Sequence, residues 1–141
     1  MEELLKYLTE HRISVMAVNL PDHGVHAATI HYAHSDTPFK LFFSTERSSR
    51  KCQGLLDGKS TSASVVVGFS EDEWITVQMD GEIKAVLEET ELKNAKSIYY
   101  AKYPSSKKYE NKPENIFLEF VPTWWRYSDY NPEPPMIKTS N

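Results

Sequence analysis

A short stretch rich in serine and basic residues, Ser44–Lys51 (STERSSRK), holds the side chains best suited to bind an anion. It lies between a strand-like run, residues 40–43, and a helix-like run that begins at Cys52. Cations are unfavourable at a helix N-terminus, where free N–H groups already supply positive potential, yet three basic residues gather at this helix start. A bound phosphate would offset their charge, with a serine hydroxyl as N-cap and donor. The alternative is a solvated basic turn balanced by Glu46, and these residues alone leave both interpretations open.

Composition favours a single soluble domain. The chain has 141 residues, 40% of them hydrophobic and 26% charged, and no apolar run approaches the length of a membrane span. Its net charge of −4 argues against general binding to nucleic acid. The first residues, MEELLKYL, lack the basic segment and cleavage site of a secretory signal. We therefore expect a cytoplasmic protein, with the lone Cys52 as a buried structural thiol.

Hydrophobic periodicity predicts three helices and six strands. Antiparallel strands in succession, with helices at the corners, indicate an α+β protein built on a closed or nearly closed barrel. Gly81 lies within a strand and indicates either a β-bulge or a place where another group approaches the backbone closely. Residues 1–130 would form the domain, and the proline-rich residues 131–141 an extended or disordered tail. The expected helices are residues 2–11, 52–57 and 88–103, and the expected strands are 13–20, 25–33, 39–43, 63–69, 74–87 and 116–121.

Other chemistries find less support. His31 and His34 have an H-x-x-H spacing, but residues three apart on a strand face opposite sides, and no carboxylate cluster completes a metal site. No Ser-His-Asp or Cys-His pattern indicates a hydrolase. Trp124 and Trp125 are adjacent, so one ring faces the core and the other faces out. The outward ring stacks on a ligand, packs on a partner subunit or fills the core, and the sequence leaves these open.

Four features occur together in this chain: the order of elements, the STERSSRK stretch after a strand, the W-x-x-x-x-x-D-G pattern of Trp74–Gly81 and the tryptophan-rich last strand. Together they resemble the pyridoxamine 5′-phosphate oxidase-like family of FMN-binding split barrels, over residues 3–130. The resemblance implies a six-stranded antiparallel split β-barrel of Greek-key type with short flanking helices. It also implies a homodimer that binds FMN between its subunits and acts as a flavin-dependent oxidoreductase on a small molecule.

The resemblance assigns roles to residues. Those that would hold the FMN phosphate are Ser49, Arg50 and Lys51. Ser44 and Thr45 would contact the ribityl chain or the ring edge, and the ring face would lie against Thr29 and His31. Trp125 is assigned to the cofactor site as well.

The chain also departs from the family pattern. It has Thr29 where true pyridoxamine-phosphate oxidases have an arginine, and His34 near the place of a lysine. Tyr103 replaces an arginine before Pro104, and residues 126–128 (RYS) replace an R-x-H pair. We therefore expect the flavin site to be mostly kept and the vitamin-substrate site to be lost. Two alternatives remain: a split barrel that binds deazaflavin or haem, and a non-enzymatic flavin-binding or stress-related module.

Overall fold

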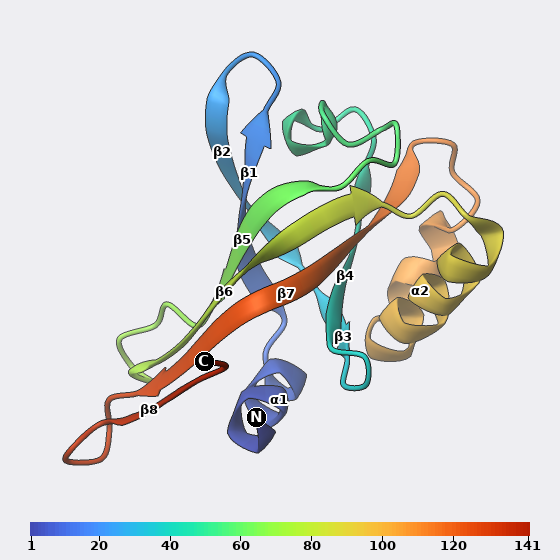
Figure 1. Cartoon of the computed structure of the whole chain (residues 1–141). Helices are drawn as coiled ribbons and strands as arrows, with labels where there is room; N and C mark the ends of the chain where they lie inside the picture. The colour runs from blue at the N-terminus through green and yellow to red at the C-terminus, as the bar shows by residue number, and fades with distance from the viewer.

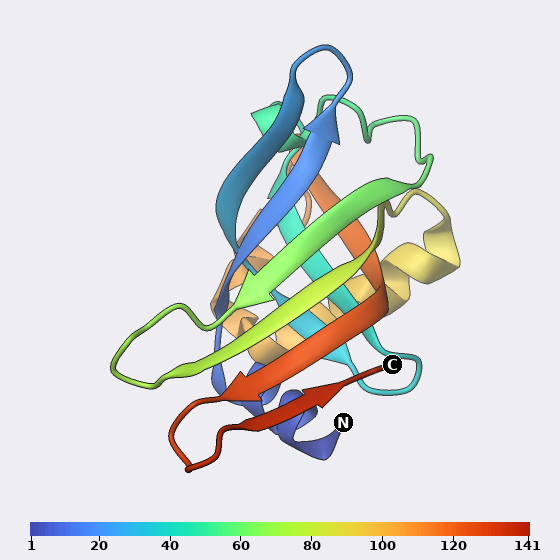
Figure 2. The same cartoon turned by 60° about the vertical axis from the view of Figure 1, so that its left-hand side comes forward.

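A strongly curled antiparallel sheet dominates the molecule, which is described for residues 1–141 by a computed structural model (Figure 1). The strands lie in the order β2-β1-β5-β6-β7-β4-β3, and β8 pairs with β7. Figure 2 shows β8 alongside the end of β7, near helix α1. The helices are α1 (Glu2–Glu10), α2 (Glu89–Lys102) and the short 3₁₀ helices η1 (Arg50–Cys52) and η2 (Pro104–Tyr109). The strands are β1 (Ile13–Leu20), β2 (Gly24–His31), β3 (Ala33–Ser35), β4 (Lys40–Glu46), β5 (Thr61–Val67), β6 (Ile75–Ala85), β7 (Asn115–Asp129) and β8 (Met136–Thr139).

The predicted α+β split-barrel class is confirmed, but the number of strands is eight rather than six. One extra strand arises because the chain leaves the β1 pairing at Tyr32, whose buried hydroxyl donates to the Leu8 carbonyl at 2.7 Å. Beyond Tyr32, β3 pairs with β4 instead. The other extra strand is β8, formed within the segment expected to be an extended or disordered tail. Its residues pair with 126–129, so this segment continues the sheet.

The bulge predicted at Gly81 is confirmed. The register between β6 and β7 shifts between Asp80 and Gly81. A Cβ at position 81 would lie 2.2 Å from the Val121 carbonyl oxygen and 2.9 Å from Pro122 Cα. Only glycine allows the two backbones to approach this closely.

The helix predicted over residues 52–57 is wrong. Of this segment only Cys52 is helical, as the last residue of the three-residue helix η1, and turns follow up to residue 57. Gly54 is unfavourable in a helix, and it packs against Pro21, with a Cβ there placed 3.2 Å from the proline ring. Cys52 and Leu55 are fully buried as expected, so two apolar anchors produced a helical pattern without a helix. Three residues generate little macrodipole, and the helix-start argument for a phosphate site therefore fails.

Two apolar clusters stabilise the fold. The larger lies inside the curled sheet and includes Met16, Val65, Met79 and Leu118, all almost fully buried. The smaller lies on the other side of β4 and β7, where α2 packs on the sheet (Figure 1). Its members are Ala33, Phe42, Val86, Ala95, Tyr99, Tyr103 and Phe117. The position of α2 is thus fixed by side chains on its buried face.

Lys102, at the end of α2, joins three distant segments. Its ammonium donates to the carbonyl oxygens of Leu8 and His11 at the C-terminal end of α1. It also lies 4.1 Å from the centroid of the Tyr32 ring. A cation is favourable at a helix C-terminus and over an aromatic face. Burial, and then the nearby Arg12, lower the pKa of Lys102 to about 8.

Lys102 makes the stability of the protein depend on pH. Its folded pKa of about 8 lies below the ordinary 10.5, so between these pH values the unfolded chain binds a proton that the folded chain does not. We therefore expect the free energy of unfolding to rise, relative to a Lys102→Met variant, as the pH increases from 7.5 to 9.5. After allowance for solvent screening the rise is about 1–2 kcal/mol.

Urea unfolding at several pH values in this range measures that difference. Lys93→Met is the matched control because Lys93 is an exposed lysine of the same helix. A wild-type stability that runs parallel to both variants across the range would contradict the role given to Lys102.

Candidate functional site

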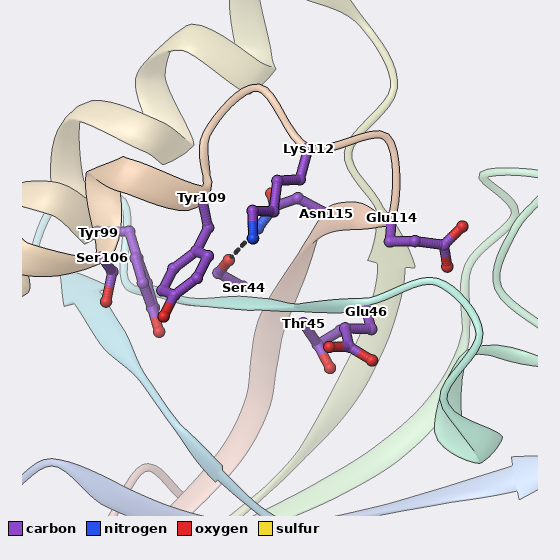
Figure 3. A pocket seen from close by; sticks show the side chains of 9 residues that line it. All are labelled: Ser44, Thr45, Glu46, Tyr99, Ser106, Tyr109, Lys112, Glu114 and Asn115. Atoms are coloured by element: carbon purple, nitrogen blue, oxygen red, sulfur yellow. Dashed lines mark hydrogen bonds between the residues drawn. The ribbon is translucent and has the colours of Figure 1, made fainter.

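A pocket of about 340 Å³ opens where the end of β4 and the start of β7 meet α2 and η2 (Figure 3). Its walls come from two parts of the chain that are distant in sequence, residues 44–46 and 99–115. The lining residues are Ser44, Thr45, Glu46, Tyr99, Ser106, Tyr109, Lys112, Glu114 and Asn115. Two of them, Ser44 and Thr45, are predicted flavin contacts.

The pairing of β4 with β7 fixes the floor of the pocket. Ser44 lies opposite Phe117, and Glu46 opposite Asn115. Asn115 Nδ2 donates to Ser44 Oγ at 2.9 Å, as the dashed line in Figure 3 shows. Because the serine oxygen accepts this bond, its own hydrogen is left to donate to a ligand.

Aromatic hydroxyls form one wall. Tyr99 is 5% exposed, and burial, followed by the neighbouring Tyr103 and Tyr100, raises its pKa to about 12. Tyr109 is exposed, and Lys108 and Lys112 lie 5.1 and 4.9 Å from its ring centroid. In Figure 3 the hydroxyl groups of Tyr99 and Tyr109 point the same way, and neither bonds to another residue of the pocket. The wall therefore presents hydroxyl donors to the pocket.

The basic turn lies beside the pocket, beyond the end of β4. Arg47 is used structurally, since its Nε donates to the Pro113 carbonyl at 3.1 Å. Ser49 Oγ donates to the Glu46 carbonyl at 2.7 Å, so its hydroxyl serves the turn itself. Arg50 and Lys51 form no ion pair with any carboxylate of the chain. These two cations are thus free to meet an external anion.

Thr29 and His31 lie on the exposed face of β2, and η1 contacts this strand. The His31 ring meets Tyr103 edge to face, with centroids 5.6 Å apart. Partial burial, and then Arg12 and Lys102, lower the pKa of His31, which favours the neutral imidazole. The structure therefore places both residues on one surface, separate from the Ser44 pocket.

Trp125 lies far along β7 from the pocket. It pairs with Met79 and packs against the main core, while Trp124 occupies the opposite face of the strand. Eight strand residues separate Trp125 from Phe117, the partner of Ser44, a span of about 25 Å. Within one chain, the structure does not bring Trp125 together with Ser44 and Thr45.

Seven pocket residues were not predicted as site residues: Glu46, Tyr99, Ser106, Tyr109, Lys112, Glu114 and Asn115. Residues 104–113 look like a polar loop, and only the docking of α2 brings them to β4. The number of tyrosines at the end of the predicted helix could have indicated the site, because it is larger than one buried helix face requires.

Solved structures share this fold. A protein from Clostridium acetobutylicum related to general stress protein 26 of B. subtilis, of the pyridoxinephosphate oxidase family, superposes with a TM-score of 0.69 at 14% identity, over 99% of this chain and 93% of its own. The FAD binding protein from Mycobacterium smegmatis matches at 0.65 and 13% identity, over 88% and 90% of the two chains. A heme binding protein from the same organism superposes with a TM-score of 0.74 at 11% identity, over 97% of this chain and 57% of its own. No family model and no curated protein matches the sequence.

These likenesses confirm that the chain has the split-barrel fold inferred from its sequence motifs. The chain thus shares its fold with solved structures described as an FAD binding protein and as a heme binding protein. None of its helices is long and apolar enough to cross a membrane.

Proposed function

We propose that this protein binds FMN as a homodimer and serves as a flavin-dependent oxidoreductase for a small molecule. Arg50 and Lys51 hold the phosphate, and Ser49, whose hydroxyl closes the turn, positions them. Ser44 and Thr45 contact the ribityl chain or the ring edge, and Thr29 and His31 lie along the ring. A bound flavin would supply the redox chemistry, while the protein orients it and shapes the substrate pocket.

The observation that carries the proposal is the pair of cations without partners, Arg50 and Lys51, directly after the strand that bears Ser44 and Thr45. A phosphate favours paired basic groups and hydroxyl donors, and charge-assisted hydrogen bonds to it are strong. Structures of the same fold are described as an FAD binding protein and as a member of the pyridoxinephosphate oxidase family. A flavin as ligand agrees with the first of these descriptions.

An uncovered face of the sheet supports the homodimer. Ile13 and Val15 of β1 share this face with Val25 and Ala27 of β2, and Val25 is 73% exposed. Exposed apolar surface of this kind is typical of an interface. Thr29 and His31 lie on the same face, so a second copy seated there would enclose them. This arrangement fits a cofactor held between subunits.

Haem is the second candidate ligand, because a split barrel of this fold is described as a heme binding protein. His31 is exposed, and a neutral imidazole is the form that binds iron. The two ligands have different visible spectra, which separates the candidates directly.

Titration of the purified protein with FMN tests the proposal. We expect saturable binding with perturbed flavin absorption bands, no Soret band after incubation with haemin, and a sedimenting mass near twice the 16.3 kDa of the chain. Reduction of the bound flavin by a nicotinamide donor would support the oxidoreductase, and a flavin that stays oxidised would favour a binding module. The absence of saturable FMN binding would refute the proposal.

A further inference from the structure

The pocket beside Ser44 has two chemically different ends (Figure 3). At one end stand the hydroxyl donors of Tyr99, Ser106 and Tyr109. At the other end lie Glu46 and Thr45, consecutive residues of β4, with Ser44 and Asn115 between the two ends. The carboxylate of Glu46 takes part in no hydrogen bond with another residue of the pocket and in no ion pair. Donors and an acceptor thus face one space without partners.

The charge of the lining limits what can enter. One ammonium, Lys112, stands against two carboxylates, Glu46 and Glu114, so the pocket is slightly negative. A phosphate dianion is disfavoured there, which separates this pocket from the basic turn at Arg50 and Lys51. An uncharged ligand avoids both the repulsion and the cost of burying a charge.

We infer that the pocket binds an uncharged planar heteroaromatic molecule of the 2-amino-4-oxo type, the ring pattern of pterins and guanine. Its adjacent amino and ring N–H groups donate in parallel to the Glu46 carboxylate, a pairing that a carboxylate accepts with both oxygens. Its carbonyl oxygen, adjacent to the ring N–H, accepts from the Ser44 hydroxyl, and a nitrogen of its second ring accepts from Tyr99 or Tyr109 at the other end of the pocket. The pocket, at about 340 Å³, accommodates a two-ring molecule.

Only one part of this inference rests on the proposed function: that the ligand of the pocket is the molecule that reacts with the flavin. Ser44 and Thr45 belong to both, since they line the pocket and lie on the strand that leads to the basic turn. Binding to the pocket itself requires no flavin and is measured without one.

Fluorescence titration of the full chain with pterin tests the inference, in the flavin-free and the FMN-loaded protein. We expect saturable binding in both, and binding at least 10-fold weaker for lumazine, which has an oxygen in place of the amino group. Glu46→Gln should weaken pterin binding about 10-fold or more, and Tyr109→Phe about 2- to 10-fold. Tyr130→Phe is the matched control, because Tyr130 is an exposed tyrosine outside the pocket.

Several results would overturn the inference: lumazine binding as tightly as pterin, Glu46→Gln behaving like Tyr130→Phe, phenyl phosphate displacing pterin, or loss of pterin binding when FMN is loaded. Circular dichroism shows whether each variant remains folded, and Glu46 is exposed, so its replacement disturbs no core. FMN binding without pterin binding rejects this inference alone. Pterin binding without FMN binding rejects the proposed function alone.

Discussion

Replacing both Arg50 and Lys51 by alanine is expected to weaken FMN binding about 100-fold or more. Both side chains lack an anionic partner within the chain. The double substitution would therefore remove the two positive charges that pair with the FMN phosphate. Two charge-assisted contacts contribute on the order of 2–5 kcal/mol together. Equilibrium titration of flavin fluorescence measures the loss.

The same change of net charge placed elsewhere separates a specific contact from general electrostatics. Lys59→Ala with Lys93→Ala removes two exposed lysines and should leave the FMN affinity within about 2-fold. Free energies of unfolding of both double variants should stay close to the wild type, since Arg50 is exposed and Lys51 forms no ion pair. Equal losses of affinity in the two double variants would argue against a phosphate at the basic turn.

Gly81→Ala should destabilise the protein by about 3 kcal/mol. The added methyl group would lie 2.2 Å from the Val121 carbonyl oxygen, and both atoms belong to strands paired along their length. Neither backbone can withdraw without breaking hydrogen bonds of the β6–β7 ladder, so the strain remains in the folded state. Urea or thermal unfolding of the variant measures the effect.

Gly54→Ala provides the comparison for this substitution. Its added methyl group would contact the side chain of Pro21 at 3.2 Å in a surface turn, where a small shift relieves the contact. We expect a change of less than about 1 kcal/mol. If Gly81→Ala were as stable as Gly54→Ala, the bulge between β6 and β7 would have space for a methyl group, which would contradict the prediction.

Local pattern was sufficient for most of the fold. The alternation in β1 and β5, and the helical spacing of α2, reflect one buried face each, and these elements occur where the sequence predicts them. The errors arise where distant contacts decide the structure. The break between β2 and β3 depends on Tyr32 reaching α1, and β8 forms because the end of β7 offers a free edge. Neither cause is visible in the local sequence.

The site was predicted only in part for a related reason. The sequence located the pocket floor, Ser44 and Thr45, through their position after a strand and before a basic turn. Its other wall, with Tyr99 and Tyr109, comes from a segment more than 50 residues away that reaches the site only when α2 packs on β4 and β7. Periodicity reports which face of a helix is buried, but not which pocket its polar residues border.

Besides Tyr32 and β3, helix α1 contacts residues in the second half of the chain. Leu8 is bonded to Lys102, 94 positions later, Glu3 to Lys138 at 2.6 Å, and Tyr7 meets the Tyr127 ring edge to face. Contacts between residues this far apart in sequence form late, because the loop that joins them must first close. During synthesis on the ribosome, α1 therefore emerges well before Lys102, Tyr127 and Lys138 and completes its docking only after them, with Leu4 and Leu8 not fully buried until then.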